Sequence, residues 1–223
     1  MVLKQVLRNS KSPANHSHSP AVSSPLPHQF PASFGLLLLI LLGLPVTAAA
    51  HTEAGTVDGF VSGFTHPISG LDHAAAMFAV GLWGAFLGQR AMWILPVIFP
   101  VVMAFGGALG VLGIPFPAVE TGIALSGAVL GLMVALAVKP PLWLAAVVVG
   151  LFAMFHGHAH GTELPETANA LVYSIGFVIS TGLLHLSGIA LGLLVRWPWG
   201  RGVVRAGGAG IALVGFGFLF NLL

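Results

Sequence analysis

Six long apolar segments fill most of residues 51–223 and restrict the possible folds of this chain more than any other feature. Each segment approaches the ~20 residues that a helix needs to cross a bilayer. Only helices and closed barrels satisfy their backbone groups in lipid, and these segments are continuously apolar rather than alternating. We therefore predict an all-α integral membrane protein with six transmembrane helices. Their expected limits are residues 66–88, 91–114, 118–138, 141–158, 168–195 and 203–222.

Composition supports a membrane location and gives no support to nucleic-acid binding. Of the 223 residues, 57% are hydrophobic and 6% are charged, whereas a soluble domain carries roughly 25% charged residues. Three of the eight Lys and Arg residues lie in the first 50 positions, which leaves five cations against six acids in the rest of the chain. The remainder is thus nearly neutral, and one helical domain is its simplest organisation.

The first 50 residues are typical of a secretory signal peptide with an unusually long polar start. Residues 1–33 are polar, residues 34–46 form an apolar run shorter than a span, and residues 47–50 end in alanines. This order predicts cleavage after Ala50 and a six-helix transmembrane domain of residues 51–223. The alternative is an uncleaved anchor that adds one span. The length of the polar region indicates that the true start codon lies downstream.

The charged residues predict the orientation. A cleaved signal peptide leaves the mature N-terminus in the periplasm and the domain in the cytoplasmic membrane of a bacterium. Alternation of six spans then places every remaining cation on the cytoplasmic side, as the positive-inside rule requires. These cations are Arg90, Lys139, Arg196, Arg201 and Arg205. The acids of residues 51–223, and the histidines other than His185, fall on or near the outer side.

A first cluster of ionisable residues begins the first apolar segment. His66 and His73 are seven residues apart, which places them on one face of a continuous helix, and Met77 continues that stripe. If the helix begins near His66, Asp72 and His73 lie roughly 9–10 Å deeper. An ionised Asp72 there costs up to a few kcal/mol unless it is paired or hydrated. A bound cation or a water-filled vestibule would offset that cost.

A second cluster closes the fourth segment. His156 and His160 share a face if the helix persists, whereas a helix frayed at the two following glycines would let both rings converge with Glu163. His158 projects about 200° away from His156 on a regular helix, so it is the weakest candidate ligand. Together, the two clusters predict a site for a divalent metal ion at the outer end of the helices.

Four further residues are candidates around this site. Glu120, at the outer start of the third segment, could bind the metal ion through its carboxylate or could hold a metal ligand in place by a hydrogen bond. Met77 is a minor option as a ligand. His185, in the inner half of the fifth segment, could continue the path inward or simply bond another helix. His51, as a new N-terminus, would present its amine and ring nitrogen as a chelating pair. The chain has no cysteine, so nitrogen and oxygen ligands suit nickel, cobalt, zinc or iron and argue against copper(I).

The motif H-x5-D-H at residues 66–73, with FHGxAHGxE at residues 155–163, resembles the HupE/UreJ family. These are membrane proteins associated with nickel hydrogenases and ureases, and the resemblance covers essentially all of residues 51–223. It implies a nickel permease, or in some members a cobalt permease, with hydrogenase or urease maturation proteins as possible partners. By position, it assigns metal ligation to His66, Asp72, His73, His156, His160 and Glu163.

The expected function is uptake of a divalent transition metal, with nickel first and cobalt second, by a protein that is not an enzyme. No ATP-binding motif is present, so a gradient, the membrane potential, trapping or a separate protein must supply the energy. Imidazole ligates metal only when neutral, so we expect uptake to fall as pH drops through about 6–6.5.

Two other classes of function remain open at this point. One is a membrane metalloenzyme, such as a hydrolase with an open position on a catalytic zinc, although H-E-x-x-H is absent. The other is a scaffold that supplies metal to hydrogenase or urease maturation without transporting it. The cytoplasmic loops are short for an elaborate docking surface.

Overall fold

A computed structural model describes residues 56–164 and 169–223, and for residues 56–58 the backbone alone. The predicted signal peptide and His51 lie outside these residues, so both stay predictions. Within the described ranges every regular element is a helix and no strand occurs. All of them belong to one compact unit, residues 48–223.

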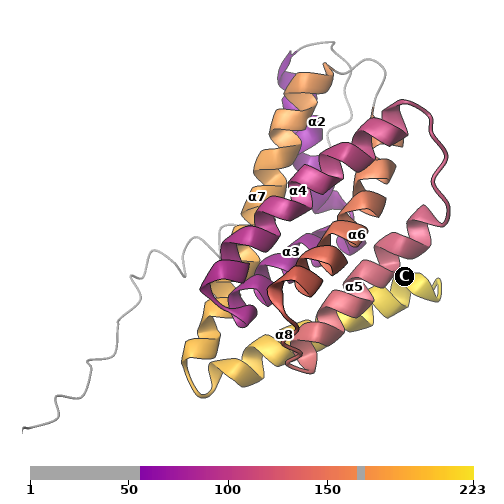
Figure 1. Ribbon diagram of the computed structural model, residues 1–223. Helices are drawn as coiled ribbons and strands as arrows, with labels where there is room; N and C mark the ends of the chain where they lie inside the picture. Colours follow the sequence, from indigo (N-terminus) through magenta and orange to yellow (C-terminus); the bar gives the residue numbers. More distant parts are fainter. Residues whose placement is uncertain (1–55, 165–168) are drawn as a thin grey trace, which may run out of the picture. The chain divides into compact units, whose positions relative to one another are not determined.

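The described residues of this unit form seven α-helices and one short 3-10 helix (Figure 1). They are α2 (Thr56–Ser69), α3 (Leu71–Leu87), α4 (Gln89–Val111), α5 (Val119–Ala135), α6 (Leu142–Thr162), α7 (Ala170–Gly192), η1 (Leu193–Arg196) and α8 (Gly200–Leu219).

The first predicted span is two helices rather than one. The axes of α2 and α3 are bent by 80° at a break after Ser69, so the prediction of one continuous helix from His66 is wrong. Pro67 lies in the last turn of α2 and has no N–H for the helical ladder. Gly70 is extended at φ −86° and ψ 111° and starts α3. His66 and His73 therefore belong to different helices, and the bend, not helical periodicity, relates them.

Four helices are long and apolar enough to cross a membrane: α4, α6, α7 extended by η1, and α8. The bent pair of α2 and α3 passes the same test as a fifth crossing. Helix α5 is apolar but has only 17 residues. Length and composition thus support four or five spans in the part of the chain that is described, and a sixth stays a prediction.

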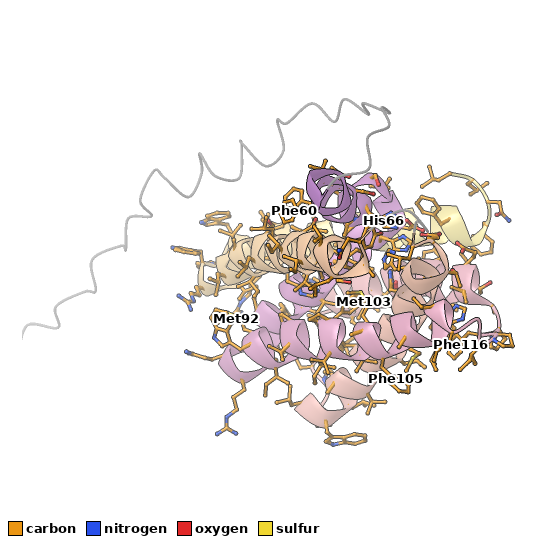
Figure 2. The ribbon with its side chains drawn as sticks, turned by 90° about the horizontal axis from the view of Figure 1, so that it is seen from above. Phe60, His66, Met92, Met103, Phe105 and Phe116 are labelled. Atoms are coloured by element: carbon orange, nitrogen blue, oxygen red, sulfur yellow. The ribbon has the colours of Figure 1, made fainter. Side chains whose placement is uncertain are left out.

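The outer surface of these helices is apolar, as expected of residues that face lipid. On α4, Val97, Val101 and Phe105 are about 60% exposed or more, and Phe105 points away from the other helices in Figure 2. Polar side chains are instead enclosed between the helices, where Ser126, His156 and His185 are at most 2% exposed. This distribution is the one that a bilayer favours.

Glycines let the helices approach closely in pairs. Helix α6 packs along α4, and α8 packs along α5 (Figure 1). A Cβ on Gly157 would overlap the carbonyl group of Met103, and one on Gly161 would overlap that of Gly107. The glycines at four-residue spacing, such as Gly106 and Gly110, likewise lie against the backbone of a neighbouring helix. Small residues one turn apart thus let neighbouring helix backbones approach closely, as in other helices that pack in lipid.

The cations gather at one end of the helices. The Nζ of Lys139 lies 5.2 Å from the ring centroid of Phe86, at the end of α3. The Nε of Arg205, on α8, donates a hydrogen bond of 2.7 Å to the carbonyl oxygen of Ala135, at the end of α5. The Nε1 of Trp83 donates to the carbonyl oxygen of Val138. The ends of α3 and α5 and the start of α8 therefore meet there.

Candidate metal site

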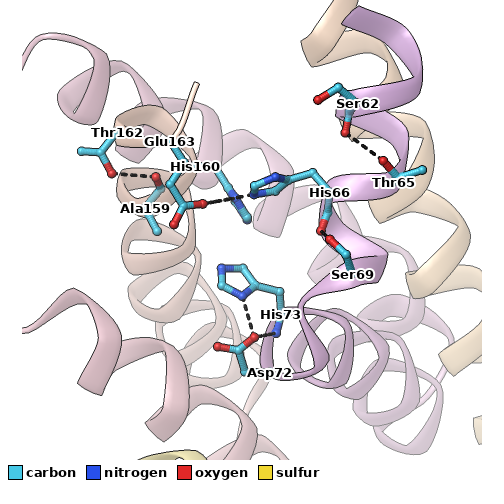
Figure 3. A network of polar contacts seen from close by, with 10 residues as sticks. All are labelled: Ser62, Thr65, His66, Ser69, Asp72, His73, Ala159, His160, Thr162 and Glu163. Atoms are coloured by element: carbon cyan, nitrogen blue, oxygen red, sulfur yellow. Dashed lines mark hydrogen bonds and ion pairs between the residues drawn. The ribbon is translucent and has the colours of Figure 1, made fainter. Parts of the chain in front are cut away.

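Side chains from α2, α3 and α6 converge at the opposite end (Figure 3). Helix α2 ends beside the start of α3, and both face the last turns of α6. The contact of α6 with α4 through Gly157 and Gly161 fixes the depth of the histidines that flank these glycines. Two sequence clusters that are about 90 residues apart therefore form one site.

Asp72 determines which nitrogen of His73 is free. Its Oδ1 accepts one hydrogen bond of 2.8 Å from the backbone N–H of His73 and another of 2.8 Å from Nδ1 of the same residue. A carboxylate only accepts, so Nδ1 carries the proton and Nε2 keeps a lone pair. That Nε2 is buried and has no hydrogen-bond partner among the described residues.

Asp72 lies in the first turn of α3, not two turns inside a helix as predicted. Its charge is stabilised by the helix N-terminus and by the two hydrogen bonds from His73. These contacts already offset part of the cost of burying the carboxylate. A bound cation is therefore not required to explain Asp72 on its own.

Ser126 performs the corresponding task for His156. The hydroxyl of Ser126 donates to the carbonyl oxygen of Ile123 at 2.6 Å, so its oxygen must accept from Nε2 of His156 at 2.8 Å. This leaves Nδ1 of His156 with a lone pair. Within the described part of the chain that nitrogen is buried and has no partner.

His160 completes a group of three histidines. Neither ring nitrogen of His160 makes a hydrogen bond to any described residue, although both are buried. The ring of His73 lies 4.9 Å from that of His156 and 4.6 Å from that of His160, between centroids. One nitrogen from each of the three residues can be chosen so that all lie within 4.8 Å of one another. We call this the three-histidine group.

Each residue of the three-histidine group has a buried ring nitrogen without a partner among the described residues, and a metal ion would supply one. Buried polar atoms without partners are rare in proteins, and each carries a desolvation cost. Nitrogens that bind one tetrahedral ion at 2.0–2.1 Å are roughly 3.4 Å apart. Small side-chain movements, on the order of 1 Å, would therefore bring the three-histidine group to ligand distance.

A second group lies at the mouth of the site and shares one member with the first. It consists of His66, His160 and Glu163, whose ligand atoms also lie within 4.8 Å of one another. His66 Nε2 donates to Glu163 Oε2 at 3.1 Å, and His160 Nδ1 lies 4.0 Å from the same oxygen. The side chains of His66 and Glu163 are 30% and 50% exposed, whereas that of His160 is 7% exposed. We call this the mouth group.

Helix α6 remains regular through Thr162, so fraying does not bring these side chains together. His156 and His160 share a face of an intact helix, which was the other interpretation of this segment. His158 points elsewhere: its Nε2 donates to the carbonyl oxygen of Ile114 at 2.8 Å, and its ring stacks on Phe116. The expected angle between His158 and His156 agrees with this placement.

Other predicted residues lie outside both groups. Glu120 is exposed in the first turn of α5. Met77 is fully buried in the apolar core. His185 is buried on α7, with its ring centroid 5.4 Å from that of Phe99. The contact of Ser126 with His156 was not predicted, because its one signal is a serine in an apolar helix 30 residues away.

An apolar cavity of about 340 Å³ opens beside His160, between α4, α6 and α7. Its walls include Met103, Gly107, Tyr173 and Phe177. Most of this surface is apolar, so it gives a hydrated cation few groups to bind on its way to the histidines. The polar mouth group is the better entrance for an ion.

Comparisons with known proteins identify the family of this chain. The family model described as "HupE / UreJ protein" matches residues 39–218. The chain is 50% identical to Protein HupE of Rhizobium leguminosarum bv. viciae over 181 residues, which are 81% of this chain and 94% of that protein. No solved structure matches significantly. The chain belongs to the HupE/UreJ family.

Proposed function

We propose that this protein carries a divalent transition metal, nickel first, into the cell through the bacterial cytoplasmic membrane. The observation that supports this most directly is the three-histidine group, with its unpartnered nitrogens on His73, His156 and His160. Membership of the HupE/UreJ family supports the same proposal. His66, Asp72 and Glu163 complete the proposed set, and His51 is retained as an additional ligand of the mature N-terminus.

The ion enters at the mouth group and passes to the three-histidine group. The half-exposed carboxylate of Glu163 attracts the hydrated cation, and His66 and His160 replace part of its water. Because His160 belongs to both groups, it holds the ion while His73 and His156 replace the two outer ligands. The ion is thus never without protein ligands as it leaves water, where its desolvation is most costly.

The proposed orientation follows from charge. The arginines and the lysine of the described residues lie at the end of the helices remote from the histidines, where Arg205 and Lys139 contact α5 and α3. The positive-inside rule places that end in the cytoplasm. The 21 residues of α6 separate the two ends by about 30 Å. In this proposal the bent α2–α3 pair and the short α5 each cross once, which makes six spans and places the histidines on the periplasmic side.

Imidazole and carboxylate ligands accept nickel and cobalt alike, and geometry decides between the two. We propose nickel because the family is associated with nickel hydrogenases and ureases. Maturation proteins of those enzymes are the corresponding candidates for receiving the metal.

Metal accumulation in cells tests the proposal. Cells that express the wild type, His73→Ala or His156→Ala at matched membrane levels are supplied with low external nickel or cobalt, and cell-associated metal is measured. His158→Gln is the matched control, because it lies on the same helix outside both groups and keeps a donor for the Ile114 carbonyl oxygen. We expect accumulation in the wild type and the control and its loss in both alanine variants.

Other outcomes would favour another function. Wild-type accumulation equal to that of empty cells, with metal still bound by the purified protein, would replace transport with a delivery scaffold. Metal-dependent turnover of a lipid or peptide by the purified protein would favour a membrane hydrolase.

A further inference from the structure

His185 lies about midway between the three-histidine group and the end of the helices where the cations gather, which we call the basic end. Its backbone packs against Gly81 of α3, where an added Cβ would overlap the His185 carbonyl oxygen. Gly81 follows His73 by eight residues of α3, about 12 Å, and precedes the end of the helix at Leu87 by six residues, about 9 Å. His185 itself is 2% exposed, so it is enclosed between α3, α4 and α7.

Two prolines of α4 explain which hydrogen-bond partner one nitrogen of the His185 ring has. Pro100 has no N–H, so the carbonyl oxygen of Pro96 lacks its usual helical partner. The His185 ring donates a hydrogen bond to that oxygen. The nitrogen left without a partner among the described residues is Nε2. Nδ1 is therefore the donor, and Nε2 presents a lone pair at the middle of the helices.

Two hydroxyl groups on α7 are also left unpartnered near His185. Ser174 and Ser187 bond the carbonyl oxygens four residues before them at 2.7 and 2.8 Å, as hydroxyls in apolar helices commonly do. Ser180 and Thr181 are buried, and their hydroxyls bond no atom in the described ranges. Thr181 precedes His185 by four residues, so both side chains lie on one face of the helix.

The ring of Phe99 lies close both to His185 and to His156 of the three-histidine group. Its ring centroid lies 5.5 Å from that of His156 and 5.4 Å from that of His185. An aromatic face attracts cations, so the ring is less of an obstacle to a partly dehydrated ion than an aliphatic side chain would be. Two histidines that each have an unpartnered nitrogen among the described residues therefore lie next to one aromatic ring.

We propose that Nε2 of His185 and the hydroxyl of Thr181 form an inner binding position for the transported divalent cation. The inference rests on the proposed uptake function and adds a second position to it. The three-histidine group and the mouth group, together the outer groups, share His160 and hold one ion at a time. A chain that also has the inner position therefore binds two ions. The inner ion, held by few ligands, is released toward the basic end when another arrives at the three-histidine group.

Metal binding by the purified full-length chain in detergent tests this position with Ni²⁺ and Co²⁺ as probes. His185→Asn is the informative variant, because the asparagine amide can donate to the Pro96 carbonyl oxygen but offers no group at the place of Nε2. Thr181→Val removes the hydroxyl at nearly constant shape. We expect two ions per chain in the wild type and in His158→Gln, one in His185→Asn, and an inner affinity weakened roughly tenfold in Thr181→Val.

Each result has a distinct consequence. If His185→Asn binds two ions as the wild type does, the inner position is wrong. If the wild type binds only one ion, the inner position is also wrong, although uptake through the outer groups stands. If two ions bind, only the inner one is lost in His185→Asn and cells show no uptake, the inner position stands and the proposed transport function fails.

Discussion

The Nδ1 of His73 donates a 2.8 Å hydrogen bond to the Oδ1 of Asp72, the residue that precedes it. The same oxygen accepts the backbone N–H of His73, so the carboxylate holds both the main chain and the ring of its neighbour. The free Nε2 is thereby directed into the three-histidine group. Asp72 thus orients the ring of His73, a proposed metal ligand, through these two hydrogen bonds.

Replacement of Asp72 by asparagine should weaken metal binding without unfolding the site. The amide keeps the shape of the carboxylate but loses its charge, so it neither fixes the His73 tautomer nor makes the ring more basic. We expect the dissociation constant of the three-histidine group for Ni²⁺ to rise roughly 10–100-fold. Titration of the purified variant beside Glu120→Gln, whose carboxylate lies outside both groups, measures the change. Equal affinities in the two variants would contradict the positioning role.

Removing the hydroxyl of Ser126 should have a smaller effect of the same kind. Ser126→Ala deprives His156 Nε2 of its acceptor, and the loss of one such hydrogen bond is worth about 1 kcal/mol, or roughly a fivefold weaker affinity. Ser174→Ala is the control, because that hydroxyl bonds only its own helix. A titration in which the Ser126 and Ser174 variants cannot be distinguished would show that Ser126 does not orient His156.

The bend between α2 and α3 limited what the sequence could predict about the site. The apolar runs predicted the helices from α4 onward near their observed limits but missed the start of α2 at Thr56. The helical angle correctly separated His158 from His156. Pro67 and Gly70 could both be read from the sequence. The prediction nevertheless used helical periodicity alone and so placed His66 and His73 on one helix face. The hydrogen bond that His156 donates to Ser126 depends on the packing of α5 against α6, which no local pattern encodes. The same holds for the place of His185 beside Pro96.

Glu163→Gln should impair capture of the ion more than its onward movement. The variant keeps an oxygen that accepts the His66 hydrogen bond but loses the half-exposed negative charge of the mouth group. A loss on the order of 1.4 kcal/mol corresponds to a tenfold rise in the metal concentration for half-maximal uptake. The maximal rate should change little, because the three-histidine group is intact. Uptake measured over a range of external nickel tests this, and an unchanged half-saturation with a lower maximal rate would contradict it.

Gly161→Ala should destabilise the protein by separating α6 from α4. The added methyl would overlap the carbonyl oxygen of Gly107, so the two helices must move apart. Overpacking of this kind typically costs about 1–3 kcal/mol. Gly210→Ala on α8 is the matched control, because its Cβ meets no atom within 4 Å and alanine is the better helix former by about 1 kcal/mol. Thermal unfolding in detergent should show a lower midpoint for Gly161→Ala and an equal or higher one for Gly210→Ala. Because α6 carries His156 and His160, Gly161→Ala should also lose metal affinity. Equal unfolding midpoints for Gly161→Ala and Gly210→Ala would mean that α4 and α6 do not pack as closely as described.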